Sequence, residues 1–224
     1  MNSVVFIQQN INMFNIVKYR EIKEKLEKKA KNCQIIAISK NHPRQSVLEA
    51  LNQGVRIFGE NRVMEAKSKF LGLKDQFANI ELHLTGPLQS NKVKEAVNIF
   101  DVFHTLDREK IAREFSKYTE TLITKKIFIQ VNTGEEISKS GISPKDLRSF
   151  LEYCKNDMKL NICGLMCIPP IDDNPDDHFS LLKNLVEKNN LTNLSIGMSG
   201  DYESAIKFNP SYIRLGTILF GKRA

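Results

Sequence analysis

The chain has 224 residues, of which 41% are hydrophobic and 26% charged, with a formal net charge of +7. This composition is typical of a globular protein, and with no linker in the chain we expect one domain over residues 1–224. No apolar run approaches the roughly 20 residues of a membrane span. Residues 1–10 lack the basic region of a signal peptide. We therefore expect a cytoplasmic protein without membrane contact.

Two further partner classes are excluded by the distribution of charges and thiols. Basic residues are interleaved with acids, and no nucleic-acid-binding motif occurs, so the positive charge does not predict a nucleic-acid partner. The cysteines form no CxxC pair and are expected to be free thiols, with no metal site; they are Cys33, Cys154, Cys163 and Cys167.

Short apolar runs alternate with helical patterns after a first amphipathic helix near 18–31. Strands are predicted at 34–39, 55–58, 80–85, 102–105, 126–132, 161–168, 193–197 and 212–220. Helices are predicted at 44–52, 61–70, 90–98, 108–118, 144–155, 175–188 and 202–208, with Asp107 and Ser143 as N-caps and Pro144 at a first helical position. The alternation predicts a parallel sheet, and eight units of this length fit an α/β fold of the (β/α)₈ TIM-barrel type. A doubly wound open sheet is the alternative.

Lys40 is the most informative single residue. It follows a short β-branched run that predicts a strand buried on both faces, and an Asn-His-Pro turn signal comes next. The lysine then stands at the carboxyl end of a core strand, where parallel α/β folds bind ligands. Partial desolvation there favours the uncharged amine, which attacks aldehydes. The alternative is a lysine that extends from the strand end into solvent.

Small and hydroxyl residues follow the last two predicted strands. Gly197-Met198-Ser199-Gly200-Asp201 leads into a helix, and Gly216-Thr217 lies one strand later. Such turns let backbone N–H groups approach an anion, and a helix N-terminus favours negative charge. Because barrels often bind phosphate after strands seven and eight, we predict a phosphate site here. A plain helix N-cap by Ser199 or Asp201 is the alternative.

Arg214 lies two residues before Gly216 and therefore on the same face of its strand. An arginine facing the barrel interior needs an anion or a ring as partner, and a salt bridge to Glu60 is the alternative. A nucleophilic lysine opposite a phosphate site predicts a phosphorylated aldehyde held as a Schiff base, and pyridoxal 5′-phosphate (PLP) fits. Arg214 at the pyridine nitrogen makes the ring a weaker electron sink than a carboxylate partner would, which favours restrained chemistry or none.

The motifs resemble those of the pyridoxal phosphate homeostasis proteins, single-domain relatives of the alanine racemase N-terminal barrel. The matching stretches are 37–40, 58–66, 83–92, 130–133, 139–141, 164–166, 197–202 and 213–217. The resemblance implies a TIM barrel like the alanine racemase N-terminal domain, with PLP bound to Lys40. It also implies phosphate contacts from Ser199, Gly216 and Thr217, Arg214 at the ring nitrogen, Asn61 near the ring and Met198 beside the phosphate loop.

Some positions depart from the family or have two interpretations. Leu82 stands where the family usually has tryptophan, and Pro87 where it usually has histidine, so the role of this loop is in doubt. His83 is a weaker site candidate, because a core histidine bonded within the barrel is equally expected. The segment from Thr133 to Gly141 is either a flexible gate or an ordinary solvated loop.

The predicted function is PLP homeostasis: the protein buffers PLP or delivers it to apo PLP-dependent enzymes, with no catalytic residue. A PLP-dependent racemase is the alternative, and a Schiff-base aldolase a weaker one. Racemisation needs acid–base groups on both faces of the carbanion, and Lys40 can serve one. The racemases take the other, a tyrosine, from a C-terminal β-domain, whereas this chain ends at Ala224 and offers only Tyr202 near the rim. Since that domain also builds the racemase dimer, we expect a monomer.

Overall fold

The computed structural model describes residues 14–222, and within them eight parallel strands close into one barrel in chain order. The last strand pairs with the first, so that Arg214 lies beside Ile36. The predicted TIM barrel is therefore confirmed, and the open doubly wound sheet is wrong. The strands are β1 (Gln34–Ile38), β2 (Ile57–Glu60), β3 (Glu81–Leu84), β4 (Val102–Leu106), β5 (Lys126–Gln130), β6 (Ile162–Met166), β7 (Asn193–Ser195) and β8 (Tyr212–Leu215).

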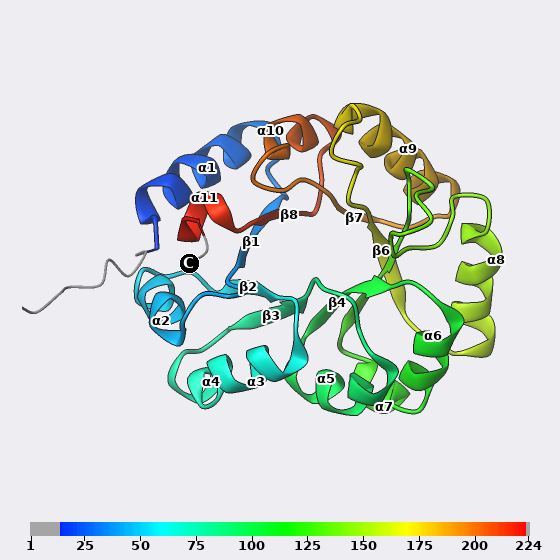
Figure 1. The fold of residues 1–224 in the computed structure, drawn as a ribbon, viewed down its shortest axis with the longest axis horizontal. Coiled ribbons are helices and arrows are strands. Elements are labelled where there is room, and N and C mark those ends of the chain that lie inside the picture. Colours follow the sequence, from blue (N-terminus) through cyan, green and yellow to red (C-terminus); the bar gives the residue numbers. More distant parts are fainter. Residues whose placement is uncertain (1–13, 223–224) are drawn as a thin grey trace, which may run out of the picture.

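The helices form a ring around the barrel, with α11 beside α1 where the two ends of the described chain meet (Figure 1). The backbone N–H of Asn15 donates to the carbonyl of Leu219 at 2.8 Å and ties these ends together. The described helices are α1 (Ile16–Lys29), α2 (Arg44–Asn52), α3 (Val63–Phe70), α4 (Leu73–Gln76), α5 (Val93–Ile99), α6 (Glu109–Ser116), α7 (Thr119–Leu122), α8 (Leu147–Glu152), α9 (Pro175–Lys188), α10 (Tyr202–Ala205) and α11 (Thr217–Phe220). None of them is long and apolar enough to cross a membrane.

Two apolar layers hold the fold together, one between strands and helices and one inside the barrel. Strand β1 shows the division, because Ile35 and Ala37 belong to the outer layer and Ile36 and Ile38 to the inner one. The alternation follows from the two-residue period of a strand. Gly59 leaves the space that the inner layer needs, since a Cβ there would lie 2.4 Å from Ile38 Cδ1. The interior is therefore packed with side chains below the mouth.

The last predicted strand, 212–220, is too long. β8 ends at Leu215, and Gly216 begins a turn in which its carbonyl accepts the N–H groups of Leu219 and Phe220 at 2.9 Å each. The run 218–220 is apolar because it packs as helix α11 against the core, with Leu219 and Phe220 fully buried. A short apolar run does not by itself distinguish a buried strand from a buried helix.

Three other local predictions are also corrected. β2 begins at Ile57, not at residue 55, and runs on to Glu60. Asp107 does not cap a helix, because α6 has Arg108 at its N-cap and Asp107 pairs with that arginine instead. Ser143 accepts the N–H of Asp146 in a turn that precedes α8, so Pro144 lies outside the helix.

Candidate functional site

One cavity of about 240 Å³ opens at the end of the barrel where the strands finish. All seven residues predicted to bind a cofactor line it. The lining consists of Ile38, Lys40, Asn61, Thr85, Ile168, Met198, Ser199, Gly200, Arg214, Gly216 and Thr217. Residues up to 179 positions apart thus meet at one mouth, as the barrel topology predicts.

Lys40 stands two residues beyond the end of β1. The N–H of Ser39 still bonds to the carbonyl of Gly59 at 3.0 Å, and the N–H of His42 then bonds back to Ser39 at 3.1 Å. Asn41 between them has φ of 61°, a left-handed conformation that asparagine tolerates better than most residues. The tight turn leaves the Lys40 side chain half-buried in the cavity wall, so it does not simply extend into solvent.

Ser199 connects the two turns that were predicted to bind phosphate. Its Oγ accepts the N–H of Gly216 at 3.3 Å and that of Ile218 at 3.4 Å, so it caps α11 and not the helix that follows it in sequence. Gly197 makes this possible with φ of +86°, and a Cβ there would lie 2.6 Å from Ala205 Cβ. Two backbone N–H groups therefore meet at Ser199 Oγ, and the exposed residue Thr217, which lies between them in the sequence, also lines the cavity.

Asp201 and Met198 complete this turn. The Asp201 carboxylate accepts the N–H of Met198, and the Met198 carbonyl accepts the N–H groups of Asp201 and Tyr202 at 3.1 and 2.9 Å. Asp201 occupies the N-cap position of α10 without a side-chain bond into that helix. The N-cap interpretation is thus correct in position for Asp201, and Ser199 caps a different helix.

Arg214 is buried, with 5% of its surface exposed, and it lines the mouth cavity. It donates to Ser195 Oγ at 2.9 Å and to the carbonyl of Cys167 at 2.8 Å. Burial lowers its pKa below the ordinary value of 12.5. The predicted alternative, a salt bridge to Glu60, is wrong: among the described residues Glu60 pairs with Lys69, and Arg214 has no ion-pair partner.

Asn61 lies on the wall beside Thr85, whose Oγ1 donates to its Oδ1 at 3.0 Å. Gly86 packs directly on the backbone here, since a Cβ at Gly86 would lie 2.4 Å from the Asn61 carbonyl. This contact holds Asn61 against the chain that follows β3. It also explains why the Thr-Gly motif needs a glycine at position 86, since any side chain would collide with Asn61.

His83 and the segment from Thr133 to Gly141, whose roles the sequence left open, lie outside the cavity lining. His83 is fully buried at the other end of the barrel, where its Nε2 is 2.8 Å from Glu81. The segment from Thr133 to Gly141 is held by hydrogen bonds, including those from Gln130 Nε2 to Ser140 and from Asn132 Nδ2 to Glu136 at 3.0 and 2.9 Å. Its role as a gate stays a prediction.

Comparison with known proteins gives the chain its family. The family model for the alanine racemase N-terminal domain matches residues 17–224. A pyridoxal phosphate homeostasis protein of Aquifex aeolicus is 36% identical over 206 residues, covering 87% of this chain and 90% of its own. One of Vibrio cholerae is 36% identical over 228 residues, covering 97% of this chain and 96% of its own. The chain belongs to the pyridoxal phosphate homeostasis protein family.

Solved structures agree with this family assignment. PipY of Synechococcus elongatus with PLP bound is 33% identical, with a TM-score of 0.80 over 92% of this chain and 99% of that one. Alanine racemase of Corynebacterium glutamicum is 13% identical, with a TM-score of 0.71 over 94% of this chain and 62% of its own. The racemase thus shares the barrel fold with this chain. This chain covers less than two thirds of the racemase's length.

Four lining residues were not named as site residues from the sequence. Thr85, Ile168 and Gly200 stand at predicted strand ends or in the predicted phosphate turn, so their position was a usable signal. Ile38 ends β1 two residues before Lys40, and the two-residue period of the predicted strand 34–39 places it on the face that leads toward the lysine. Apolar residues are overlooked because a site is usually searched for polar groups, whereas cofactor pockets are largely apolar.

Proposed function

We propose that this protein binds PLP in the mouth cavity, holds it as a Schiff base on Lys40, and buffers or delivers it without turning over a substrate. The supporting observation is the arrangement of one cavity between a half-buried lysine and a cluster of hydroxyl and N–H donors at Ser199, Gly216 and Thr217. The PLP-bound PipY structure, from a related protein, supports the choice of ligand. The proposal includes one PLP-binding domain over residues 1–224, a monomer, and a cytoplasmic location.

The residues present fit this cofactor. Bound PLP supplies an aldehyde that condenses with an amine, together with a phosphate that requires several donors. Lys40 offers the amine, while Ser199 and Thr217 offer hydroxyls in the lining of the same cavity. At the ring nitrogen, Arg214 would keep a proton on its own guanidinium and donate a hydrogen bond, because arginine remains charged in proteins. Asn61 and Met198 would flank the ring and the phosphate turn.

The cavity lining favours a carrier over a racemase. Among the described residues that line it, Lys40 and Arg214 are the ionisable ones, and the lining contains no carboxylate, histidine, cysteine or tyrosine. Tyr202 is buried outside the cavity, and its hydroxyl donates to Glu203 at 3.3 Å. Since racemisation needs a group on each face of the carbanion, a second one is missing from this lining.

The decisive experiment is a visible absorption spectrum of the protein with added PLP, before and after borohydride reduction, followed by peptide mapping. We expect a yellow species whose reduced label lies on Lys40. In Lys40→Ala the covalent label should be lost, while the matched variant Lys67→Ala, at an exposed site on α3, should behave as the wild type. A wild-type protein that takes up no PLP, or a label on another lysine, would contradict the proposal.

Delivery is tested by mixing the PLP-loaded protein with an apo PLP-dependent enzyme and following recovery of the enzyme's activity. We expect recovery with the wild type and no racemisation of L-alanine by the loaded protein itself. Steady production of D-alanine would instead favour the racemase.

A further inference from the structure

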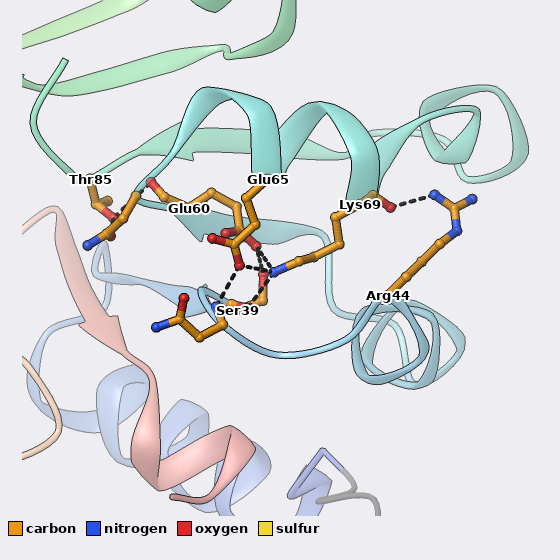
Figure 2. A network of polar contacts seen from close by, with 8 residues as sticks. Ser39, Arg44, Glu60, Glu65, Lys69 and Thr85 are labelled. Carbon is orange, nitrogen blue, oxygen red and sulfur yellow. Dashed lines mark hydrogen bonds and ion pairs between the residues drawn. The ribbon is translucent and has the colours of Figure 1, made fainter. Parts of the chain in front are cut away.

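A buried ion network lies directly behind Lys40, outside the cavity lining. Lys69 of α3 places its Nζ 2.7 Å from Glu60 Oε1 and 2.9 Å from Glu65 Oε1, as Figure 2 shows. The Lys69 side chain is 6% exposed and that of Glu60 is fully buried. An ammonium and two carboxyl groups thus share a site that is largely closed to water.

This network holds the peptide groups on both sides of Lys40. On one side, Lys69 Nζ donates to the carbonyl of Ser39 at 2.7 Å, and Ser39 Oγ donates to Glu60 Oε1 at 2.6 Å. On the other side, the backbone N–H of Asn41 donates to Glu65 Oε1 at 2.6 Å. The three-residue turn that carries the lysine is therefore tied to β2 and α3 at its Ser39 end and to α3 at its Asn41 end.

Stability alone is a poor reason for this arrangement. Buried ion pairs commonly contribute no more stability than well-packed apolar residues, because desolvation offsets the attraction. Here the second Glu60 oxygen, Oε2, is buried without a hydrogen-bond partner. Burial raises the pKa of Glu60 above its ordinary value. Burial also acts to raise that of Glu65, but hydrogen bonds from Lys69 and the Asn41 N–H outweigh it and lower the pKa.

We propose that Lys69, Glu60 and Glu65 are positioning residues that fix the turn from Ser39 to Asn41 and so aim the Lys40 amine into the cavity. The inference rests on the proposed function, because it assigns the network a role in how tightly and how long PLP is held. A turn that is already ordered loses little entropy when its lysine bonds the cofactor, whereas a loose turn must be ordered each time. Supporting residues of this kind commonly decide whether a site is accurate enough to work.

Glu65 offers the sharpest test, because its side chain is 22% exposed and its removal does not empty the core. Glu65→Leu removes the acceptor for the Asn41 N–H. Glu65→Gln keeps an oxygen that can accept it and removes only the charge. Lys69→Met removes the central ammonium. Lys67→Met is the matched control on the same helix, because Lys67 pairs with Glu95 on the surface.

Two measurements are made on each variant. The first is the Kd for PLP together with its dissociation rate, obtained by chasing labelled PLP with unlabelled PLP. The second is hydrogen exchange of the Asn41 amide in the protein without PLP. We expect Glu65→Leu and Lys69→Met to raise the Kd and dissociation rate by roughly tenfold and to speed exchange at Asn41. Glu65→Gln and Lys67→Met should stay within about threefold of the wild type.

The outcomes separate this inference from the proposed function. Absence of PLP uptake by the wild type would defeat the proposed function itself. Uptake by the wild type with an unchanged dissociation rate in Glu65→Leu would overturn the positioning role alone, even if that variant were less stable. An equal effect in Lys67→Met would also overturn it, because the change would then come from surface charge.

Discussion

The two ends of this barrel carry polar side chains in opposite arrangements. At the floor, where the strands begin, Lys126 Nζ lies 2.9 Å from Tyr212 Oη and 3.4 Å from Glu81 Oε2, and His83 bridges Glu81 and His104 at 2.8 Å each. These groups bond to one another. At the mouth, Arg214 and Ser199 bond to backbone and side-chain groups of the protein, and together with Lys40 and Thr217 they also border one open cavity.

The floor network has one consistent set of proton positions. A hydrogen bond with His83 lowers the pKa of Glu81 to about 2, so Glu81 is an acceptor, and burial lowers the pKa of both histidines, so each ring carries one proton. His83 therefore donates from Nε2 and accepts on Nδ1 from the Nε2–H of His104, and His104 Nδ1 is left buried without a partner. The His104 ring stacks on Phe128 at 4.6 Å between centroids. Both imidazoles are thus neutral parts of the packed interior.

A polar residue inside the barrel is therefore informative only together with its partners. His83 and Lys40 both look chemically active in the sequence, yet the histidine is enclosed and the lysine lines a cavity. Residues at the floor of such barrels generally serve stability and those at the mouth serve function. Substitutions at each end test this division.

The largest effect should come from His83→Ala. The substitution leaves Glu81 and His104 without their partner and opens a cavity, which should lower the free energy of unfolding by about 3 kcal/mol in urea titrations. The Kd for PLP should change less than about twofold, because the floor does not line the site. His178→Ala on α9 is the comparison: its side chain is 11% exposed and pairs with the largely exposed Asp173, so the loss of unfolding free energy should be smaller than in His83→Ala. A large loss of PLP affinity in His83→Ala would contradict the division between the two ends.

The pH dependence of stability should reveal the neutral imidazoles. Burial lowers the pKa of His83 and, more strongly, of His104 below the ordinary 6.5. Below pH 6.5 the unfolded chain therefore binds more protons, so this stabilisation is present above about pH 6.5 and is lost as the pH falls. Glu81 adds a loss in the same direction, between pH 4.5 and about 2.

His104→Phe isolates the contribution of one imidazole. Between pH 7 and 5, the variant should lose about 1–2 kcal/mol less unfolding free energy than the wild type. Urea titrations at a series of pH values measure both proteins under equal conditions. Parallel pH profiles would mean that His104 is not neutral in the folded protein.

At the mouth, Ser199→Ala should weaken PLP binding by about fivefold to tenfold, which corresponds to the net loss of one ordinary hydrogen bond. Binding is followed by absorbance titration. Pyridoxal, which lacks the phosphate, should bind equally well to both proteins, and Ser149→Ala on α8 should bind PLP as the wild type does. An equal loss with pyridoxal would place the effect of Ser199 elsewhere than at the phosphate.

The smallest effect is expected for Gly200→Ala. A Cβ there meets nothing within 4 Å, so stability should change by less than about 0.5 kcal/mol and the Kd for PLP by less than about twofold. Gly197→Ala, three residues earlier, should cost about 1–3 kcal/mol, because its φ is +86° and Ala205 lies 2.6 Å from the new Cβ. Thermal unfolding compares the two variants, and equal stabilities would contradict the requirement for glycine at position 197.

Much of the fold and site follows from local patterns in the sequence. Short apolar runs between helical segments predict parallel strands, and parallel strands place their carboxyl ends at one mouth. Residue type and strand position therefore group five candidate residues, and all of them line the cavity: Lys40, Ser199, Arg214, Gly216 and Thr217. The resemblance to the homeostasis family adds Asn61 and Met198, which line the cavity as well.

Only the tertiary structure decided which polar groups meet. The partners in the polar contacts lie apart in the sequence: 9 positions separate Lys69 from Glu60, 21 positions separate His83 from His104, and 131 positions separate Glu81 from Tyr212. It also decided that residues 217–220 form a helix, because a short apolar run does not by itself distinguish a buried strand from a buried helix. Sequence patterns report the preferences of neighbouring residues, whereas these contacts depend on the closure of all eight strands and the side chains it brings together.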